Sequence, residues 1–489
     1  MRRRTLIRPW WLVSIAVWAM AGCKPTPEST PAGDTRPARD VAVRLLVADD
    51  PALAAAISQV SGEWKARSGA TISIAETTSA ELVANEALPA DVDAVIYPSA
   101  LLGTLARRGW LTPLPEDYAG NRELAWSDTF ELLQIAETRW QQSPLAVPLG
   151  SPVLSCYYRT DLFEKFHRRP PSTWKEYREL AEFFSRRENL GDAAPATDAE
   201  WFGCVEPLSE GWGGRPELAR AAADIKHRDH YSTFFQIDTM QPLIDGTGYV
   251  RALEELAADA KLGPANPRTA DLDAVRNAFL QGQTALAIAW PGHQRATKPM
   301  SSMPATGFCE LPGSADVFNI ADMSWEPRTP EEGVHVTLLG LSGRLASVCE
   351  PSAHANQAVQ LLAWLSGKNW GGDIGAVSSA SPATTLYRRS QMRLTQPWVD
   401  AGTDAEAART YGEAVRDALN RPTYLLALRI PGHDRYLAAL DAAVSEVLGG
   451  ESTAADALTT AAARWNEITD ELGRDAQRQA YHQSLGLEP

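Results

Sequence analysis

Cysteine is scarce in this chain, which has five in 489 residues, and no two of them have the CxxC spacing. Zinc sites and thioredoxin-type redox sites commonly use that spacing, so neither is predicted, and we expect no metal and no other cofactor. Basic residues are also in short supply, since 46 Lys and Arg face 61 Asp and Glu and leave a formal charge of −15. An acidic surface of this kind disfavours nucleic acid as a partner.

Long apolar runs are missing after the first twenty residues, so the rest of the chain is expected to be soluble. The run near the start has about 14 residues, short of the roughly 20 that span a bilayer, which disfavours an uncleaved membrane anchor. Arginines precede this run and Ala21-Gly22-Cys23 follows it, as in an export signal over residues 1–22. The junction resembles the lipobox of bacterial lipoproteins, which implies cleavage before Cys23 and a lipid on its thiol.

Residues 23–40 are rich in Pro, Thr and Ala and contain almost nothing that could be buried. This composition predicts a disordered tether between the lipid and the fold. The lipoprotein resemblance thus implies a mature chain on the periplasmic or cell-surface side, anchored in a membrane by its lipid.

Disulfides are expected in such an oxidising compartment. If Cys23 carries lipid, an even number of cysteines remains: Cys156, Cys204, Cys309 and Cys349. Four cysteines allow three pairings. We favour 156–204 with 309–349, and four buried free thiols are the alternative left open.

Patterns for nucleophilic or metal chemistry are also lacking. Residues 340–343 read Gly-Leu-Ser-Gly and do not form the G-x-S-x-G turn of hydrolases. His227 and His230 could share one face of a helix, but basic neighbours crowd them, so a solvated loop is favoured. The adjacent Tyr157 and Tyr158 suggest a ferric-ion site, yet neighbouring side chains of a strand point to opposite faces. We therefore predict that the protein is not an enzyme.

Strands and helices alternate in the first ordered part of the chain. The apolar run Val41–Ala48 predicts a buried strand, and Asp50-Pro51 then precedes a stretch with apolar residues at helical spacing. Further strands are expected at Ala70–Ala75 and Val92–Tyr97. Such alternation predicts an α/β fold with a parallel sheet, and the length is sufficient for two or three domains with full cores.

Four segments carry recognisable motifs: LARRGWLTPL at 105–114, the stretch from AVPLG through YYRTDLF to PSTW at 146–174, AFLQGQTALAI at 278–288 and WNEI at 465–468. Together and in this order they resemble the extracellular solute-binding proteins of bacterial ABC importers, in particular the large family that binds sugars. The second segment is the most specific, since YYRTDLF is close to the family pattern YYN.DLF. The resemblance covers about residues 41–467.

The resemblance implies a periplasmic-binding-protein-like fold, with two α/β lobes, a hinge of crossing strands and a ligand cleft between the lobes. The expected lobes are 41–148 with 295–350 and 152–290 with 351–475. By the same resemblance, the protein is a monomer that closes around a sugar or oligosaccharide and delivers it to an ABC permease.

Two other hypotheses stay open. The protein could be a ligand-binding module that feeds a sensor or a surface complex, or a cell-envelope enzyme on the same scaffold. The enzyme hypothesis would require acidic or nucleophilic residues that converge in the cleft.

Tryptophan is the second compositional signal, with 16 in the chain. Sugars present apolar C–H faces and hydroxyl edges, so their sites need flat aromatic rings beside hydrogen-bonding side chains. Trp290, at the end of a predicted strand, is the first candidate, and Trp212 and Trp325 lie in loops; ordinary packing is the alternative for each. The polar candidates follow first-lobe strands or stand at the crossover: Asp49, Asp50, Ser99 and Ser151. For Asp50, capping of the following helix is an equal alternative.

Overall fold

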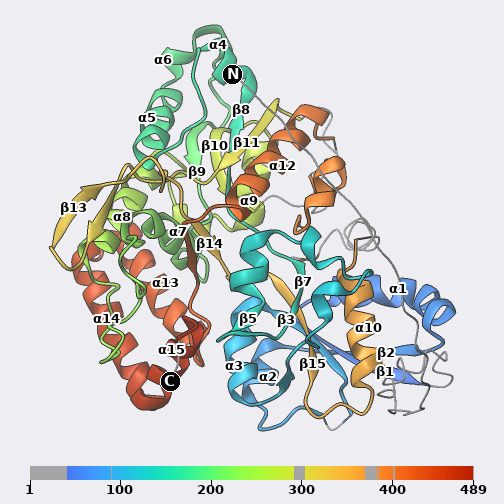
Figure 1. Cartoon of the computed structure of the whole chain (residues 1–489). Helices are drawn as coiled ribbons and strands as arrows, with labels where there is room; N and C mark the ends of the chain where they lie inside the picture. Colours follow the sequence, from blue (N-terminus) through green and yellow to red (C-terminus); the bar gives the residue numbers. More distant parts are fainter. Residues whose placement is uncertain are drawn as a thin grey trace, which may run out of the picture.

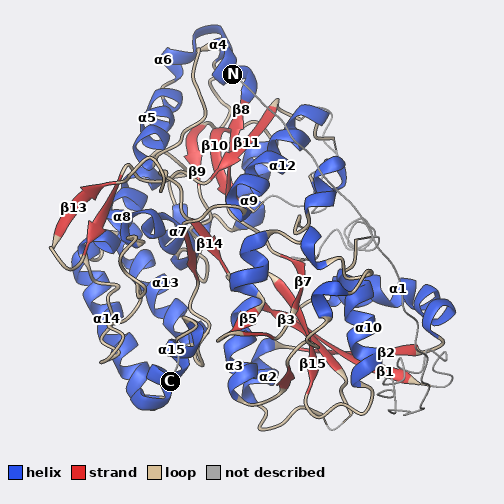
Figure 2. Cartoon of the chain, in the orientation of Figure 1, coloured by secondary structure: helices blue, strands red, loops and turns tan. Residues whose placement is uncertain are grey.

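The computed structural model describes residues 41–89, 91–290, 303–368, 381, 383, 385–399 and 402–487. The predicted signal 1–22, Cys23 and the tether up to residue 40 lie outside the described residues. Figure 1 shows two groups of strands, one at the lower right and one at the top, with a set of helices at the lower left. Within the described ranges, no helix is both long and apolar enough to cross a membrane. The predicted α/β fold is confirmed, with a separate sheet in each lobe (Figure 2).

The first sheet draws on two distant parts of the chain. Its elements and their helices are β1 (Ala42–Ala48), α1 (Pro51–Ser68), β2 (Thr71–Thr77), α2 (Ser79–Ala84), β3 (Ala94–Pro98), α3 (Leu102–Arg107), β4 (Leu111–Thr112), β7 (Val147–Gly150), β15 (Arg344–Cys349) and α10 (Ala355–Ser366). β1 pairs in parallel with β2 and β3, and β15 runs antiparallel to β3, β4 and β7. Trp64 of α1 packs on Trp364 of α10 with ring centroids 5.4 Å apart, and both are buried core residues.

The second sheet has the order β11-β8-β10-β9. Its elements and their helices are β8 (Ser155–Arg159), α4 (Thr160–Lys165), α5 (Trp174–Ser185), α6 (Arg187–Leu190), β9 (Phe202–Val205), α9 (Leu272–Leu280), β10 (Thr284–Ala289), β11 (Thr306–Glu310) and α12 (Ala405–Leu419). The adjacent tyrosines point to opposite faces, as predicted: Tyr157 packs on Phe279 and Phe308, and Tyr158 packs on Phe163. Helices therefore cover the sheet on both sides.

A third group of elements lies beside the second sheet and completes that side of the molecule (Figure 1). It consists of α7 (Gly214–Ile225), α8 (Thr247–Ala260), the hairpin β12 (Asp316–Asn319) and β13 (Ser324–Pro327), α13 (His433–Gly449), α14 (Ala454–Glu471) and α15 (Arg474–Ser484). α15 contacts both sides of the molecule. Its Tyr481 hydroxyl lies 2.8 Å from the Ser232 hydroxyl, while Gln483 Oε1 accepts a hydrogen bond of 2.9 Å from Arg107 of α3.

The chain crosses between the sheets more than once, as the two-lobe fold predicts. One crossing leads from β7 to β8, and another leads from β14 (Thr337–Leu339) to β15. β14 pairs in parallel with β16 (Tyr424–Leu426), which brings a late part of the chain to the crossing. Near it lie a π-helix (Leu133–Glu137), β5 (Arg139–Trp140) and β6 (Ser143–Pro144).

Two segments depart from the expected lobe boundaries. β11 falls in the range 295–350 expected in the first lobe, yet it pairs with β8 of the second sheet. α10 falls in the range 351–475 expected in the second lobe, yet its Trp364 packs on α1. Which sheet a segment joins depends on contacts between segments that are far apart in the chain. The order of motifs along the sequence carries no information about those contacts.

The favoured disulfide pairing is corrected by the structure, in which Cys156, Cys204, Cys309 and Cys349 are free thiols. Cys156 and Cys204 lie on β8 and β9, and β10 stands between these strands. Two strand spacings amount to about 9.6 Å, whereas a disulfide needs Cα atoms within about 7 Å. Cys309 and Cys349 belong to different sheets. The alternative of free thiols is therefore the arrangement observed.

Candidate functional site

A cavity of about 310 Å³ lies between the two lobes, and we call it the cleft cavity. One wall comes from the carboxyl ends of β1 and β3, the edge at which open α/β sheets commonly bind ligands. The opposite wall comes from α7, from the loop before it and from α13. The lining residues that matter most below are Asp49, Ala100, Arg215, His433 and Asp441.

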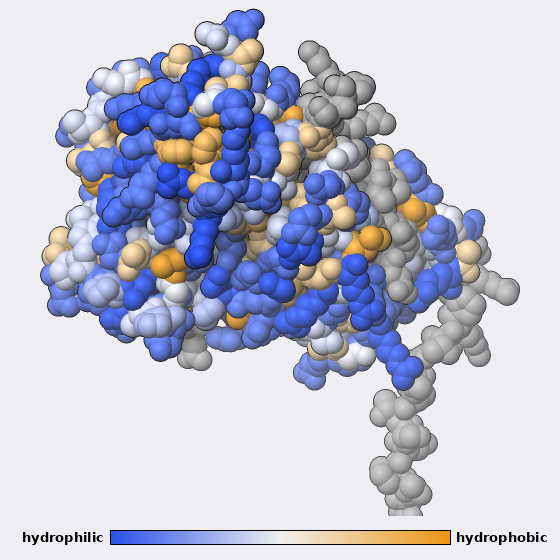
Figure 3. Space-filling view, turned by 90° about the horizontal axis from the view of Figure 1, so that it is seen from above, coloured by the Kyte–Doolittle hydropathy of each residue, from blue (hydrophilic) through white to orange (hydrophobic). Residues whose placement is uncertain are grey.

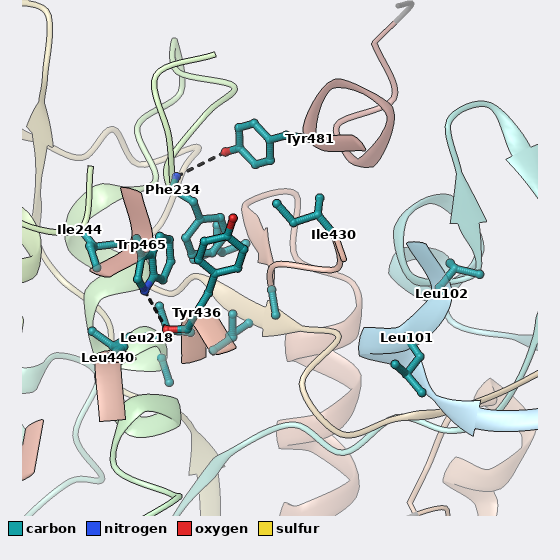
Figure 4. Packing of buried hydrophobic residues seen from close by; sticks show 14 of the residues in the cluster. Leu101, Leu102, Leu218, Phe234, Ile244, Ile430, Tyr436, Leu440, Trp465 and Tyr481 are labelled. Atoms are coloured by element: carbon teal, nitrogen blue, oxygen red, sulfur yellow. Dashed lines mark hydrogen bonds between the residues drawn. The ribbon is translucent and has the colours of Figure 1, made fainter. Parts of the chain in front are cut away.

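The apolar part of the cleft cavity is formed by one buried cluster that extends into both lobes. Figure 4 shows Phe234, Tyr436 and Trp465 grouped on one side and Leu101 and Leu102 on the other. Trp465 is 1% exposed and donates a hydrogen bond of 2.7 Å from Nε1 to the Tyr436 carbonyl. Trp465 is therefore a packing residue whose ring also forms part of the cavity wall.

Asp49 lines the cleft cavity at the end of β1. Its backbone has a φ of 52°, in the left-handed region, which turns the chain between the strand and α1. Its carboxylate accepts hydrogen bonds from the backbone N–H of Ser79, at 3.1 Å, and from the Ser79 hydroxyl. The predicted side chain is thus at the cavity, held by the first residue of α2.

Asp50 turns away from the cavity and has a structural role. It is 2% exposed and caps α1, where Oδ1 accepts the N–H of Leu53 at 3.0 Å. Oδ2 accepts hydrogen bonds from Arg344 Nε at 3.1 Å and from Ser381 Oγ at 2.6 Å. The capping alternative is the one observed, and the same carboxylate neutralises a buried arginine of β15.

Ser99 and Ser151 come together around Glu137, which the sequence analysis missed. Ser151 donates to Glu137 Oε2 at 2.6 Å, and all three side chains are buried. Burial raises the pKa of the Glu137 carboxyl, and the hydroxyls of Ser151 and Ser99 and the charge of Arg429 act in the opposite direction. Ser151 and Glu137 therefore form a buried hydrogen-bonded pair behind the cavity wall, and the Ser99 Oγ atom is buried beside them with no hydrogen-bond partner among the described residues. A glutamate at the end of a π-helix has no motif that would have identified it.

Trp212 and Trp290 form an aromatic pair beside the cleft cavity. Their ring centroids are 5.0 Å apart in an edge-to-face arrangement. The guanidinium of Arg215, which lines the cavity, stacks on the Trp212 ring with Cζ 4.6 Å from its centroid. The two tryptophans therefore affect the cavity indirectly, because they support Arg215, which lines it.

Trp325 lies away from the cleft cavity. It belongs to the hairpin strand β13, at the left edge of Figure 1. Its ring packs on Phe318, and the Arg251 guanidinium stacks on it at 3.3 Å. This third tryptophan candidate is not brought together with the other site residues.

Several polar cavity residues were missed by the sequence analysis, among them Arg215, His433 and Asp441. Arg215 Nε and His433 Nδ1 are buried and have no hydrogen-bond partner among the described residues. Burial lowers the pKa of His433, so the imidazole is neutral at neutral pH. Asp441 accepts hydrogen bonds from the backbone N–H groups of Gly211 and Gly214 and fixes the loop that carries Trp212.

A sequence signal for His433 existed. Pro431-Gly432 makes a turn directly before α13, with Gly432 at a φ of 80°, and His433 is the first residue of the helix. The Pro-Gly pair indicates a turn, but only the folded chain shows that this helix end lines the same cavity as the ends of β1 and β3.

The arrangement suits reversible binding of a neutral polar molecule. The cleft cavity combines an apolar wall with the unpaired nitrogen atoms of Arg215 and His433 and with the carboxylates of Asp49 and Asp434. Within the described residues, no group of three or more His, Cys, Asp or Glu side chains is arranged to hold a metal ion.

Comparison with known proteins gives a family match and a fold match. The chain matches the family model described as bacterial extracellular solute-binding protein over residues 51–369. MalE from Xanthomonas citri, described as a sugar-binding protein, has 16% identity and a TM-score of 0.63, over 88% of this chain and 98% of that one.

Two further solved structures carry ligands. Maltose-bound MalE3 of T. maritima has 15% identity and a TM-score of 0.62, over 88% of this chain and 100% of that one. A ribitol complex of an ABC transporter solute-binding protein from Agrobacterium radiobacter has 18% identity and a TM-score of 0.60, with the same coverage, 88% and 100%. At these identities the likeness shows a shared fold with two lobes.

Proposed function

From the premise that the chain belongs to the bacterial extracellular solute-binding protein family, we propose that it binds a carbohydrate in the cleft cavity and delivers it to an ABC permease. The observation that carries the proposal is that the walls of a single cavity come from both lobes. A ligand held by both walls stabilises the closed arrangement of the lobes, and a permease can recognise that arrangement. No covalent step is required.

The chemistry of the cavity supports a carbohydrate. Arg215 and His433 offer unpaired nitrogen atoms, and Asp49 offers carboxylate oxygens, so both hydroxyl lone pairs and hydroxyl protons find partners. The paired rings of Trp212 and Trp290 stand directly behind Arg215. The ligands bound in solved structures with this fold include maltose, ribitol and mannotriose, which are all rich in hydroxyl groups.

Each candidate residue has a distinct part in this proposal. Asp49 contacts the ligand from the first lobe, and Arg215 and His433 contact it from the second. Trp212 and Trp290 orient Arg215 and complete the aromatic side of the site. Ser99 and Ser151 act indirectly, because they hold the crossover around the buried Glu137.

A lipid anchor is the second part of the proposal. Residues 1–22 are cleaved as an export signal, Cys23 receives the lipid, and residues 23–40 connect the lipid to the fold. The family description gives an extracellular location, and a lipid anchor would keep the protein close to its permease on that side of the membrane.

We further propose that the protein works as a monomer. The face seen in Figure 3 is mostly hydrophilic, and its apolar residues occur in small groups. Stable obligate dimers bury larger apolar areas than such groups provide.

Thermal unfolding in the presence of a carbohydrate panel tests the binding proposal. A ligand at 100 times its dissociation constant stabilises the folded state by about 2.7 kcal/mol, which gives a clear rise in Tm. The panel contains maltose, mannotriose, ribitol and mannitol, with amino acids and polyamines as controls. A rise with an amino acid or a polyamine and none with any carbohydrate would contradict the proposed ligand class.

The anchor is tested separately by fractionating cells that express the full chain or its Cys23→Ser variant. The full chain is expected in the membrane fraction, with a lipidated N-terminal peptide in its mass spectrum. The variant is expected to lose the lipid. Equal membrane association of both forms, without lipid on the full chain, would overturn the anchor.

A further inference from the structure

A second and larger cavity, of about 480 Å³, lies near the crossing strands, and we call it the hinge cavity. Phe234, Ala427 and Leu428 line both cavities and separate this one from the cleft cavity. The wall of the hinge cavity comes from the first lobe at Ile135–Gln141 and from the other side of the molecule at Lys226–Phe234. Nothing in the proposed carbohydrate function makes use of it.

The charge of the hinge cavity is opposite to that of the protein. Its lining includes four basic side chains, Arg139, Lys226, Arg228 and Arg429, and one carboxylate, Glu332. The whole chain has a formal charge of −15. A basic cavity in an acidic protein selects anions, because the distant negative charge is screened while the nearby cations are not.

Of these four cations, Arg228 alone has a carboxylate partner among the residues that the structure describes. Arg228 binds Glu326 at 2.7 Å and Glu332 at 3.4 Å. Lys226 donates to the His230 carbonyl at 3.2 Å, and Arg139 donates to the Gln142 carbonyl. Among the described residues, neither Lys226 nor Arg139 has a carboxylate within 4 Å.

Arg429 is a buried cation that backbone carbonyls hold in place. It is 1% exposed, and it donates to the carbonyls of Glu137 at 2.7 Å and Arg139 at 3.2 Å. Its Nε atom is buried without a partner in the described chain. Burial lowers the pKa of this guanidinium to about 10, and the charge of Glu137 works against that shift. A buried charge with incomplete pairing is costly, and a bound anion would offset the cost.

Apolar side chains at this cavity are unusually exposed. Large hydrophobic residues of the described chain that remain exposed are few, and two of them, Ile135 at 52% and Tyr231 at 76%, line the hinge cavity. An organic ligand would cover both side chains, whereas a simple inorganic ion would leave them in water.

We propose that the hinge cavity is a second binding site, which takes a small organic anion with carboxylate or phosphate groups. Its volume lies within the range of 300–1,000 Å³ that is usual for small-molecule sites. Lys226 and Arg139 bind the anionic oxygens, since both are free of carboxylates and come from opposite sides of the cavity. Arg429 adds positive charge beneath them. Ile135 and Tyr231 cover the organic part of the ligand.

Isothermal titration calorimetry of the purified protein tests this site with citrate, glycerol 2-phosphate and chloride at one fixed ionic strength. We expect citrate or glycerol 2-phosphate to bind with a saturable heat that chloride does not give. Binding of citrate alone identifies carboxylate as the recognised group, and binding of the phosphate ester alone identifies phosphate. Absence of binding by both organic anions would overturn the proposal.

Two variants locate the site. Lys226→Gln and Arg139→Gln are each expected to weaken anion binding at least tenfold. The matched control is Lys175→Gln, because Lys175 is an exposed lysine on α5, outside both cavities. If Lys226→Gln and Arg139→Gln, folded by circular dichroism, bind the anion as tightly as Lys175→Gln, the hinge cavity is not the site.

Discussion

Cys156 and Cys309 stand directly opposite each other on the antiparallel strands β8 and β11. Opposed residues of such strands have Cα atoms about 4.5–5.5 Å apart, within the range that a disulfide spans. Burial, followed by the neighbouring Cys309 thiol, raises the pKa of the Cys156 thiol. The pair that can form a disulfide is therefore 156–309, a pairing that the chain order did not suggest.

We predict that a disulfide oxidant such as oxidised glutathione links Cys156 to Cys309. Two thiols lose their protons and two electrons to the oxidant, which is reduced to two thiols. A loop of about 150 residues is closed, so the chain-entropy model predicts a stabilisation on the order of 5 kcal/mol at most. Peptide mapping without reduction detects the link. Cys309→Ser should abolish it and Cys349→Ser should leave it intact; a link from Cys156 to Cys204 would contradict the prediction.

A second prediction concerns the aromatic pair. Trp290→Ala removes the ring that supports Trp212 and, through it, Arg215. We expect the affinity for the carbohydrate found by the thermal panel to fall about tenfold or more, which corresponds to about 1.4 kcal/mol. Calorimetric titration measures the change. Trp325→Ala is the matched control and should bind normally, because Trp325 lies outside both cavities; equal losses in the two variants would argue against the assigned site.

The third prediction separates the neighbours Asp49 and Asp50. Asp50→Ala deletes the cap of α1 and leaves Arg344 buried without its carboxylate, which costs about 3–5 kcal/mol of unfolding free energy. Asp49→Ala should cost about 1 kcal/mol or less, because its carboxylate is exposed. Urea denaturation measures both variants. The assignment fails if Asp49→Ala is the more destabilising of the two.

The fourth prediction concerns pH. Glu217 of α7 is fully buried, and neither of its carboxylate oxygens has a hydrogen-bond partner within the described structure. Burial raises its pKa well above the ordinary 4.5, against the charge of Arg220. The folded state thus holds the proton more tightly, and this contribution to stability is complete below pH 4.5 and is lost as the pH rises toward the folded pKa.

Glu217→Gln should therefore increase the unfolding free energy at pH 8 and flatten its decline between pH 5 and pH 8. Each unit of pKa shift corresponds to about 1.4 kcal/mol. Urea denaturation across this pH range measures the effect, and Glu179→Gln, an exposed change on α5, is the control. A variant that follows the unmodified protein at every pH would contradict the assigned pKa direction.

Much of the fold could be predicted because its signals are local. The apolar run of β1, the Asp50 cap and the Pro51 start of α1 are adjacent in the chain, and the structure confirms them. The placement of Asp49 at the cavity follows from the same logic, since the carboxyl ends of parallel strands share one edge.

The rest of the site depends on contacts between distant segments. Arg215 and His433 meet at the cavity only because α7 packs beside α13, more than two hundred residues later in the chain. Trp325 has the flat aromatic ring that a sugar site needs, but its hairpin places that ring against the Arg251 guanidinium. The predicted disulfide pairing was wrong for the same reason. The strand order β11-β8-β10-β9 in the sheet differs from the order of these strands along the chain.

α15 constrains how the lobes can swing. Hydrogen bonds join it to Arg107 and Gln141 on one side and to Ser232 on the other. A rotation that pulled the lobes apart at this edge would break all of these bonds, whereas a rotation about an axis along this edge would keep them. The rotation axis therefore lies along the bonded edge, and the displacement of lobe residues on opening grows with their distance from α15.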